Sequence, residues 1–146
     1  MFYIGSDGRR HTPFMVHRAL FGSLERFTAL LIEHYKGDFP FWFAPVQFGI
    51  VPIKEAHNAY AEKMEKGLKN QGFRVSLNKD NDNMRNKIKQ FQHEKIPYIL
   101  IAGDKEAADN TVSVRSRRDG DLGAMDISAL CEYLKPQIEQ GKPRCM

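Results

Sequence analysis

The feature that most constrains the fold is a regular alternation of short apolar runs and amphipathic segments from residue 45 onward. Four runs rich in β-branched and aromatic residues are predicted strands, namely 46–53, 73–77, 96–102 and 111–115. Three segments with helical spacing of their apolar residues are predicted helices, namely 54–71, 82–94 and 126–139. Because helices that separate strands favour right-handed crossovers, we predict an α/β fold with a mixed, mainly parallel sheet and helices on both faces.

The apolar residues of each predicted helix define the face that should pack on the sheet. These residues are Ala56, Tyr60, Met64 and Leu68 in the first helix, Met84, Ile88 and Phe91 in the second, and Ile127, Leu130, Leu134 and Ile138 in the third. Pro136 lies inside the third helix and is expected to kink or shorten its last turn. Residues 103–110 are expected to form a turn between the third and fourth strands.

The first 40 residues do not make a domain by themselves. They contain a predicted strand at 13–17 and a helical pattern from Leu20 to His34, which should end near Gly37. Residues 37–45 carry two prolines, as a linker does, but also four aromatic residues, which indicates that this linker packs against another part of the chain. We therefore divide the chain into residues 1–40 and a complete α/β unit at 41–146.

Composition restricts the class of protein without deciding its function. The 146 residues are 42% hydrophobic and 27% charged, and no apolar run approaches the roughly 18 residues of a membrane span. Because no secretory signal stands at the start, we expect a soluble cytoplasmic protein in which Cys131 and Cys145 are reduced thiols. The net charge of +4 favours an anionic partner, with nucleic acid ahead of a membrane.

Motifs of the common α/β enzymes are missing from the positions where they would act. The first predicted strand ends in PIKE at 52–55 rather than in a glycine-rich loop, which argues against a dinucleotide site. The sequence has neither a P-loop nor a Gly-x-Ser-x-Gly elbow, and its five histidines lack metal-ligand spacing. Asp104 and Glu106 follow a strand end, where α/β sheets place ligands, although two carboxylates in a turn are usually only solvated.

Polar residues gather in a pattern that suits nucleic acid. Three arginines run from the fourth strand into the next turn, namely Arg115, Arg117 and Arg118. The second predicted helix carries a polar stripe and is rich in asparagine at its start: Arg85, Lys89 and Gln92, with Asn78, Asn81, Asn83 and Asn86. Asparagine and arginine read base edges, whereas basic residues alone bind phosphates. From the residues alone, a nucleic-acid surface and a solvated helix with an asparagine-rich cap both stay open.

Six short motifs together resemble one family. Residues 17–27, HRALFGSLERF, are similar to motif 3 of the class II aminoacyl-tRNA synthetases. The others occur in the order of the C-terminus of threonyl-tRNA synthetases: APVQ at 44–47, KIPY at 95–98, GDKE at 103–106, TVSVRSR at 111–117 and DLG at 121–123. The resemblance covers essentially the whole chain. It implies the end of a catalytic domain at 1–40 and, at 41–146, an anticodon-binding domain with a mixed five-stranded sheet.

The resemblance also implies what the α/β unit binds. In this family the domain recognises threonine tRNA, whose second and third anticodon bases are G and U. By position in the motifs, Glu106 and Arg115 would contact base edges, and the carboxylate of Glu106 suits the N1 and N2 donors of guanine. The other implied anticodon-binding residues are Asn81 and Lys95 in the same pocket, Ile53 as an apolar wall and Lys89 as a phosphate contact.

Two residues of the first 40 match the catalytic machinery of the family. Arg26 corresponds to the motif 3 arginine that holds the γ-phosphate of ATP, and His17 to the third protein ligand of the family's zinc. In the family, ATP and zinc serve the attachment of threonine to its tRNA. The other two zinc ligands and motifs 1 and 2 have no counterpart before Met1. We therefore expect the chain by itself to bind neither cofactor and not to aminoacylate.

The expected partners are the anticodon loop of threonine tRNA and the remainder of the synthetase, whose full-length form is expected to be a homodimer; no membrane partner is expected. One alternative is an accessory α/β module of synthetase ancestry that binds nucleic acid or protein without reading an anticodon, which Glu106 and Arg115 argue against. A small-molecule α/β enzyme is disfavoured by the missing phosphate loop. Because the predicted strand at 13–17 exposes an apolar edge, we expect this segment to be labile or to promote self-association.

Overall fold

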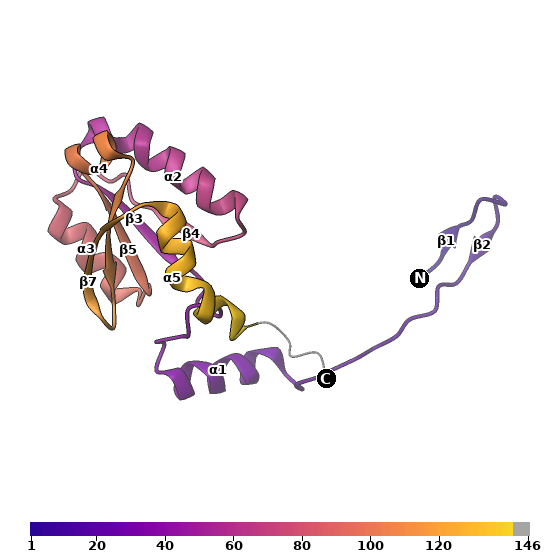
Figure 1. Ribbon diagram of the computed structural model, residues 1–146. Coiled ribbons are helices and arrows are strands. Elements are labelled where there is room, and N and C mark those ends of the chain that lie inside the picture. Colours follow the sequence, from indigo (N-terminus) through magenta and orange to yellow (C-terminus); the bar gives the residue numbers. More distant parts are fainter. Residues whose placement is uncertain (142–146) are drawn as a thin grey trace. The chain divides into compact units, whose positions relative to one another are not determined.

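The computed structural model describes residues 1–141, which form two compact units, Met1–His34 and the residues from Tyr35 onward (Figure 1). The second unit contains a five-stranded sheet in the order β4-β3-β5-β6-β7. Its strands are β3 (Phe48–Pro52), β4 (Val75–Leu77), β5 (Tyr98–Ala102), β6 (Val112–Ser116) and β7 (Gly120–Met125). Strand β3 pairs in parallel with β4 and β5, whereas the β5–β6 and β6–β7 pairs are antiparallel. The predicted mixed α/β sheet is therefore confirmed.

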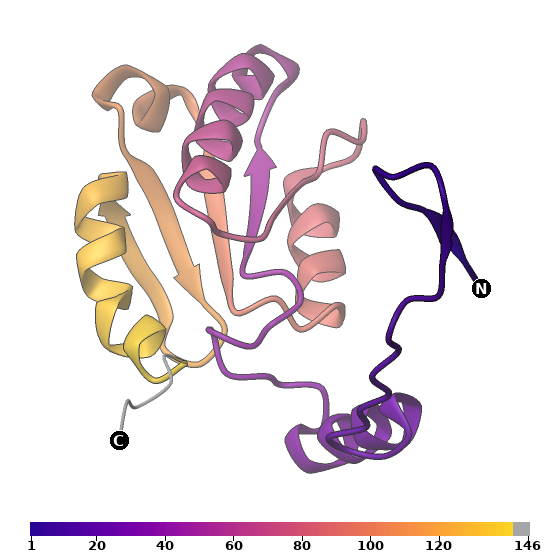
Figure 2. The same cartoon turned by 90° about the vertical axis from the view of Figure 1, so that its right-hand side faces the viewer.

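Helices flank this sheet on both faces (Figure 2). The helical elements are the 3₁₀ helix η1 (Glu55–His57), α2 (Asn58–Asn70), α3 (Met84–His93), α4 (Asp104–Asp109) and α5 (Ile127–Glu139). Helices α2 and α5 cover one face, and α3 covers part of the other. Side chains cap two of them: the carboxylate of Asp126 accepts from the Ala129 N–H at 2.6 Å, and Asn83 accepts from the Asn86 N–H at 2.9 Å. Helix α5 continues through Pro136 to its end at Glu139.

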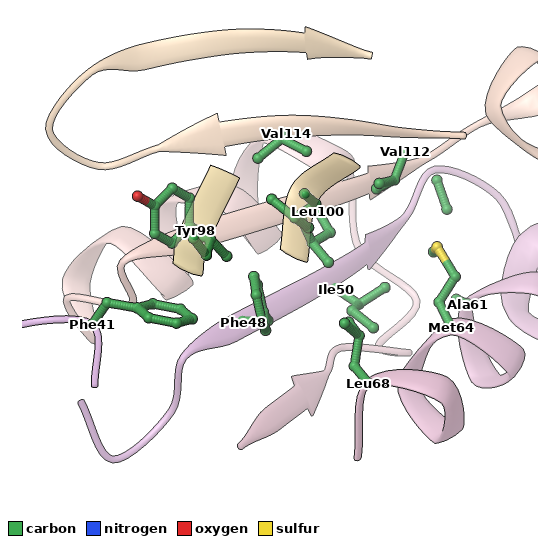
Figure 3. Packing of buried hydrophobic residues seen from close by; sticks show 13 residues of the cluster. Phe41, Phe48, Ile50, Ala61, Met64, Leu68, Tyr98, Leu100, Val112 and Val114 are labelled. Carbon is green, nitrogen blue, oxygen red and sulfur yellow. The ribbon is translucent and has the colours of Figure 1, made fainter. Parts of the chain in front are cut away.

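The larger core lies between the sheet and helices α2 and α5 (Figure 3). Phe48 and Ile50 point to this face from alternate positions of β3, and Met64 and Leu68 meet them from α2. The aromatic linker contributes Phe41, which is 4% exposed and packs edge-on against the rings of Phe48 and Tyr98. The expectation that the linker packs against the α/β unit is confirmed for Phe41.

A smaller core lies beneath α3. Val51 and Ile99 point to this face from β3 and β5, and Ile88 and Phe91 cover them from α3. Gly49 lies directly under the helix, where an added Cβ would be 2.4 Å from Cδ2 of Phe91. The missing side chain therefore lets α3 approach the sheet closely, and this approach sets the position of the loop that precedes α3.

The structure corrects three local predictions in the α/β unit. Ala56 is exposed rather than inward, because residues 55–57 form η1 and the buried position falls to His57. Residues 103–110 are not a simple turn, since they contain helix α4 (Asp104–Asp109), which is followed by Asn110 in a left-handed conformation. The residue pattern also missed β7 as a fifth strand, because its sequence GDLGAM contains no β-branched residue and two glycines.

The first unit is less regular than predicted. It contains a hairpin of β1 (Tyr3–Ile4) and β2 (Arg10–His11), followed by helix α1 (Leu24–Tyr35) across its boundary. The strand predicted at 13–17 is wrong: this segment is extended but pairs with no strand in the described part of the chain. A β conformation needs a neighbouring strand for its backbone hydrogen bonds, and the apolar pattern at 13–17 does not supply one.

Two further expectations concern thiols and membranes. Cys131 has a free thiol, and burial raises its pKa, whereas Cys145 lies outside the described residues. Within residues 1–141, no helix combines the length and apolarity needed to cross a bilayer.

Candidate nucleic-acid interface

Three parallel strands end at one edge of the sheet, and the residues that follow them meet there. The Ile53 N–H after β3 donates to the carbonyl oxygen of Ala102 in β5 at 3.0 Å, and the Asn78 N–H after β4 donates to Ile50 in β3 at 3.1 Å. Figure 1 shows α4 at this edge, near the first turn of α2. The structure therefore gathers three predicted residues at the carboxyl edge of the parallel strands: Ile53, Asn81 and Glu106.

Ile53 and Glu106 share the space above Gly103. The Gly103 N–H donates to Oε2 of Glu106 at 3.1 Å. A Cβ added to Gly103 would lie 2.7 Å from that oxygen and 2.8 Å from Cδ1 of Ile53, so both side chains lie against the glycine. Ile53 is 40% exposed and Glu106 is half-buried, so an apolar surface lies beside a carboxylate at the carboxyl edge of the sheet.

A buried histidine and an ion pair fix the start of α4, and with it Glu106. The backbone N–H of Lys54 donates to Nδ1 of His57 at 3.3 Å, so the ring proton is on Nε2. That nitrogen donates to Oδ1 of Asp104 at 2.9 Å, and the Lys54 ammonium contacts Oδ2 at 2.7 Å. Hydrogen bonds from Lys54, and then from His57, hold the pKa of the Asp104 carboxyl below its usual value. We call Lys54, His57 and Asp104 the α4 clamp.

Asn81 belongs to a cavity of about 200 Å³ beside Ile53. The cavity is lined by residues after β3, by the loop before α3 and by one residue of α3: Ile53, Lys54, Glu55, Asn58, Lys79, Asp80, Asn81, Asp82 and Lys87. Asn78 stabilises the loop, because its amide donates to Gln90 at 2.8 Å and its oxygen accepts from the Asp80 N–H at 2.9 Å. Asn83 caps α3, so these two asparagines have structural roles, whereas Asn81 faces the cavity.

Lys87 is a cavity residue that the sequence interpretation overlooked. It is 6% exposed, and its ammonium donates to the carbonyl oxygen of Pro52 at 3.3 Å. The signal was present in the spacing of Met84, Lys87, Ile88 and Phe91, which places the lysine on the apolar stripe of its helix. A cation at such a position is buried by the packing of its neighbours.

Arg115 lies on the α3 face of the sheet, away from the cavity of Ile53. It pairs with Ile99 of β5, and directly opposed side chains in an antiparallel pair share a face. Its exposed guanidinium helps to line a second hollow of about 300 Å³ next to Gln92, near the C-terminal end of α3. The neighbouring Arg117 and Arg118 both contact Asp38, at 3.7 and 3.3 Å.

The two lysines of the predicted site lie along α3 and after it. Lys89 is exposed on the helix, whereas Lys95 follows its C-terminal end in a left-handed conformation and contacts the carbonyl oxygen of Lys36. Helix α3 has 10 residues and is therefore roughly 15 Å long. Because Asn81 precedes the helix and Lys95 follows it, the structure does not bring them into one pocket. Their contacts with RNA stay predictions.

His17 and Arg26 lie in the first unit, where both are exposed. Arg26 is in the first turn of α1, and its backbone N–H donates to the hydroxyl of Ser23 at 3.4 Å. In the described part of the chain, no group of three metal-ligating side chains includes His17. Within the described residues, His17 and Arg26 by themselves do not complete a zinc site or an ATP site.

Comparison with known proteins identifies a family, curated relatives and a solved structure that are similar to this chain. The family described as "Anticodon binding domain" matches residues 47–137. Threonine–tRNA ligase of Acidobacterium capsulatum is 57% identical over 125 residues, covering 86% of this chain and 18% of that protein. Threonine–tRNA ligase of Aquifex aeolicus is 44% identical over 139 residues, covering 95% of this chain and 22% of that protein. The chain thus spans about a fifth of the length of these curated relatives.

A solved structure shows the same fold. The crystal structure of the RNA binding domain of threonyl-tRNA synthetase from Cryptosporidium parvum Iowa II superposes with a TM-score of 0.74 at 32% sequence identity. The match covers 83% of this chain and 30% of that one. The resemblance to threonyl-tRNA synthetases and the five-stranded fold implied by it are confirmed.

Proposed function

Because the chain belongs to the anticodon-binding domain family, we propose that it recognises the anticodon of threonine tRNA at the carboxyl edge of its sheet. The observation that carries this proposal is the convergence of Ile53 and Glu106 over Gly103, beside the cavity that holds Asn81. Ligands of α/β sheets bind at this edge, where the chain offers an apolar wall, a carboxylate and an amide. An unpaired base needs such a combination, because it presents a flat ring and a polar edge.

Each residue has a role in this proposal. The Glu106 carboxylate accepts hydrogen bonds from N1 and N2 of the guanine at the second anticodon position, and Ile53 contacts the base plane. Arg115 contacts a second base from the α3 face, where its guanidinium is exposed. Lys89 and Lys95 contact phosphates along α3, and their charge makes binding depend on salt.

The function of the longer protein is part of the same proposal. Its relatives carry the name threonine–tRNA ligase, which supports the attachment of threonine to tRNA. We propose that this reaction uses ATP and serves protein synthesis in the cytoplasm. In that protein, Arg26 would contact ATP and His17 would bind zinc together with ligands outside this chain, and the assembly would be a homodimer. The role of this chain is to supply the anticodon-binding surface.

Binding of the full chain to anticodon stem-loops tests the proposal. The probes are a threonine anticodon loop and loops with the second or third anticodon base changed, each measured by fluorescence anisotropy at two salt concentrations. We expect each base change to cost about 1–3 kcal/mol of binding free energy. The variant Arg115→Ala should lose this discrimination at one position, whereas Lys66→Ala, on the exposed side of α2, should keep it.

Equal binding to all loops would contradict the proposal. If affinity also fell steeply with salt, the chain would have only a basic surface that binds phosphates regardless of sequence.

A further inference from the structure

Lys87 is a buried cation whose position calls for a ligand. Its neighbours on α3, Ile88 and Phe91, belong to the core, and packing beneath the helix removes Lys87 from solvent as well. Its ammonium reaches the end of β3, where it donates to the carbonyl oxygen of Pro52. An ammonium has three N–H donors, and one carbonyl oxygen takes one of them.

Carboxylates line the same cavity as Lys87, but none of those in the described residues forms an ion pair with it. Two other lysines of the cavity form ion pairs, Lys54 with Asp104 at 2.7 Å and Lys79 with Glu62 at 2.6 Å. Within residues 1–141, Lys87 forms none. Burying a charge without a counter-ion costs free energy, and a purely structural bond to Pro52 could be made by an uncharged donor. A ligand that accepts the remaining hydrogen bonds of the ammonium would account for a lysine at this position.

The other walls of the cavity favour an uncharged ligand. Ile53 supplies an apolar surface and Asn81 an amide, while Asp80 and Asp82 also line the cavity. These two carboxylates would repel a phosphate. They tolerate a neutral ring that carries both hydrogen-bond donors and a strong acceptor, which is the character of guanine and uracil.

We propose that Lys87 donates a hydrogen bond to a keto oxygen of an anticodon base held between Ile53 and Asn81. This inference rests on the proposed function and makes Lys87 a specificity-determining residue of that site. Adenine and cytosine carry an amino group in place of the keto oxygen at position 6 or 4, and the amino group would present donors to the ammonium. Lys87 would therefore select the G and U of the threonine anticodon against A and C.

Replacing one keto oxygen by sulphur tests this contact and leaves the rest of the base unchanged. The full chain is titrated with threonine anticodon stem-loops that carry a single 6-thioguanine at the second anticodon position or a single 4-thiouracil at the third. Sulphur accepts hydrogen bonds weakly, and the ring N–H is kept. We expect one thio-substituted loop to bind the wild type between about three- and tenfold more weakly than the unmodified loop.

The variant Lys87→Met should bind that loop and the unmodified loop equally, because the contact is already lost. Lys63→Met is the matched control, since Lys63 is exposed on α2, and it should show the wild-type difference. Lys87→Gln is a second variant that keeps a donor for the Pro52 carbonyl. Circular dichroism checks that each variant is folded. If neither Lys87 variant folds, the residue is structural and the proposal is overturned.

Two other results would also overturn it. One is a loss of affinity on sulphur substitution that is as large in Lys87→Met as in the wild type. The other uses a loop in which one phosphate is replaced by a neutral methylphosphonate. If the wild type and Lys87→Met bind this loop with equal affinity, the partner of Lys87 is a phosphate rather than a base. If either result is obtained while the wild type still discriminates between anticodon bases, the role of Lys87 is overturned and the proposed function stands. If the wild type binds every base-changed loop equally, both the role of Lys87 and the proposed function are overturned.

Discussion

Single residues decide the shape of the candidate site, and Gly103 is the clearest example. Its backbone is extended, with φ at −123°, so any residue could adopt the conformation. What requires glycine is space, because Glu106 and Ile53 occupy the volume of a side chain. These contacts join residues from two strand ends, so the motif GDKE alone could not have revealed them.

Replacing Gly103 by alanine therefore tests the site more than the fold. The new methyl group should displace the Glu106 carboxylate and Ile53, both of which are partly exposed and able to move. We expect Gly103→Ala to lose about 1–3 kcal/mol of base discrimination in stem-loop binding, with little change in the urea midpoint of unfolding. Gly67→Ala is the control, because nothing lies within 4 Å of its added Cβ. A large loss of stability with unchanged discrimination would show that Gly103 serves the fold instead.

The sequence indicated part of this residue-level picture. Glu106 was predicted at a ligand-binding edge, whereas Ile53 was named only through the resemblance to the synthetase family. Their side chains lie together over Gly103, because the ends of parallel strands are set by topology. Lys95 and Asn81 were predicted in one pocket and lie beyond opposite ends of α3. The assignment of residues to pockets depends on helix direction, and short motifs do not contain that information.

At the scale of elements, α4 is held mainly by contacts that are distant in sequence. It has six residues, too few to be stable in isolation, and the α4 clamp joins its first residue to the segment after β3. A helix this short has no apolar periodicity, which explains why residues 103–110 were predicted to be a turn. Strand β7 was missed for a related reason, since its neighbour β6 determines its conformation rather than its own residues.

The α4 clamp makes stability depend on pH in a defined direction. The pKa of Asp104 in the folded chain lies below its ordinary value of 3.8, so its ion pair and hydrogen bond contribute stability above pH 3.8. This contribution is lost as the pH falls through the lowered pKa. We expect Asp104→Asn to be less stable than the wild type at neutral pH, with the difference shrinking in acid. Urea unfolding at a series of pH values measures it.

Asp109→Asn, at the opposite end of α4, is the control for this prediction. A difference between Asp104→Asn and the wild type that stayed constant from neutral pH into acid would mean that the carboxylate charge does not hold the helix.

At the scale of the whole molecule, the two units differ in how much of their apolar surface they bury. The α/β unit buries two cores, whereas α1 has no buried residue and Phe14, Val16 and Leu20 are exposed. The sequence indicated a division between residues 40 and 41, whereas the compact units meet between His34 and Tyr35. It also indicated a strand at 13–17, because an apolar pattern does not depend on the presence of a partner.

Amide hydrogen exchange tests the contrast between the units. We expect the amides of residues 13–17 to exchange rapidly in a dilute monomeric sample, because they have no strand partner in the described part of the chain, while β3 and β5 are strongly protected. Protection of residues 13–17 that rises with protein concentration would indicate pairing between chains. Strong protection in a sample shown to be monomeric would contradict the expectation.

In the proposed complex, the carboxyl edge of the sheet and the adjoining α3 face contact the anticodon. Titration of the ¹⁵N-labelled chain with a threonine anticodon stem-loop, followed by NMR, tests it directly. We expect the largest shifts at the amides of Ile53, Asn81, Gly103 and Arg115, and smaller shifts for a loop with a changed second anticodon base. Shifts gathered on α2 and α5, or shifts that are the same for both loops, would contradict it.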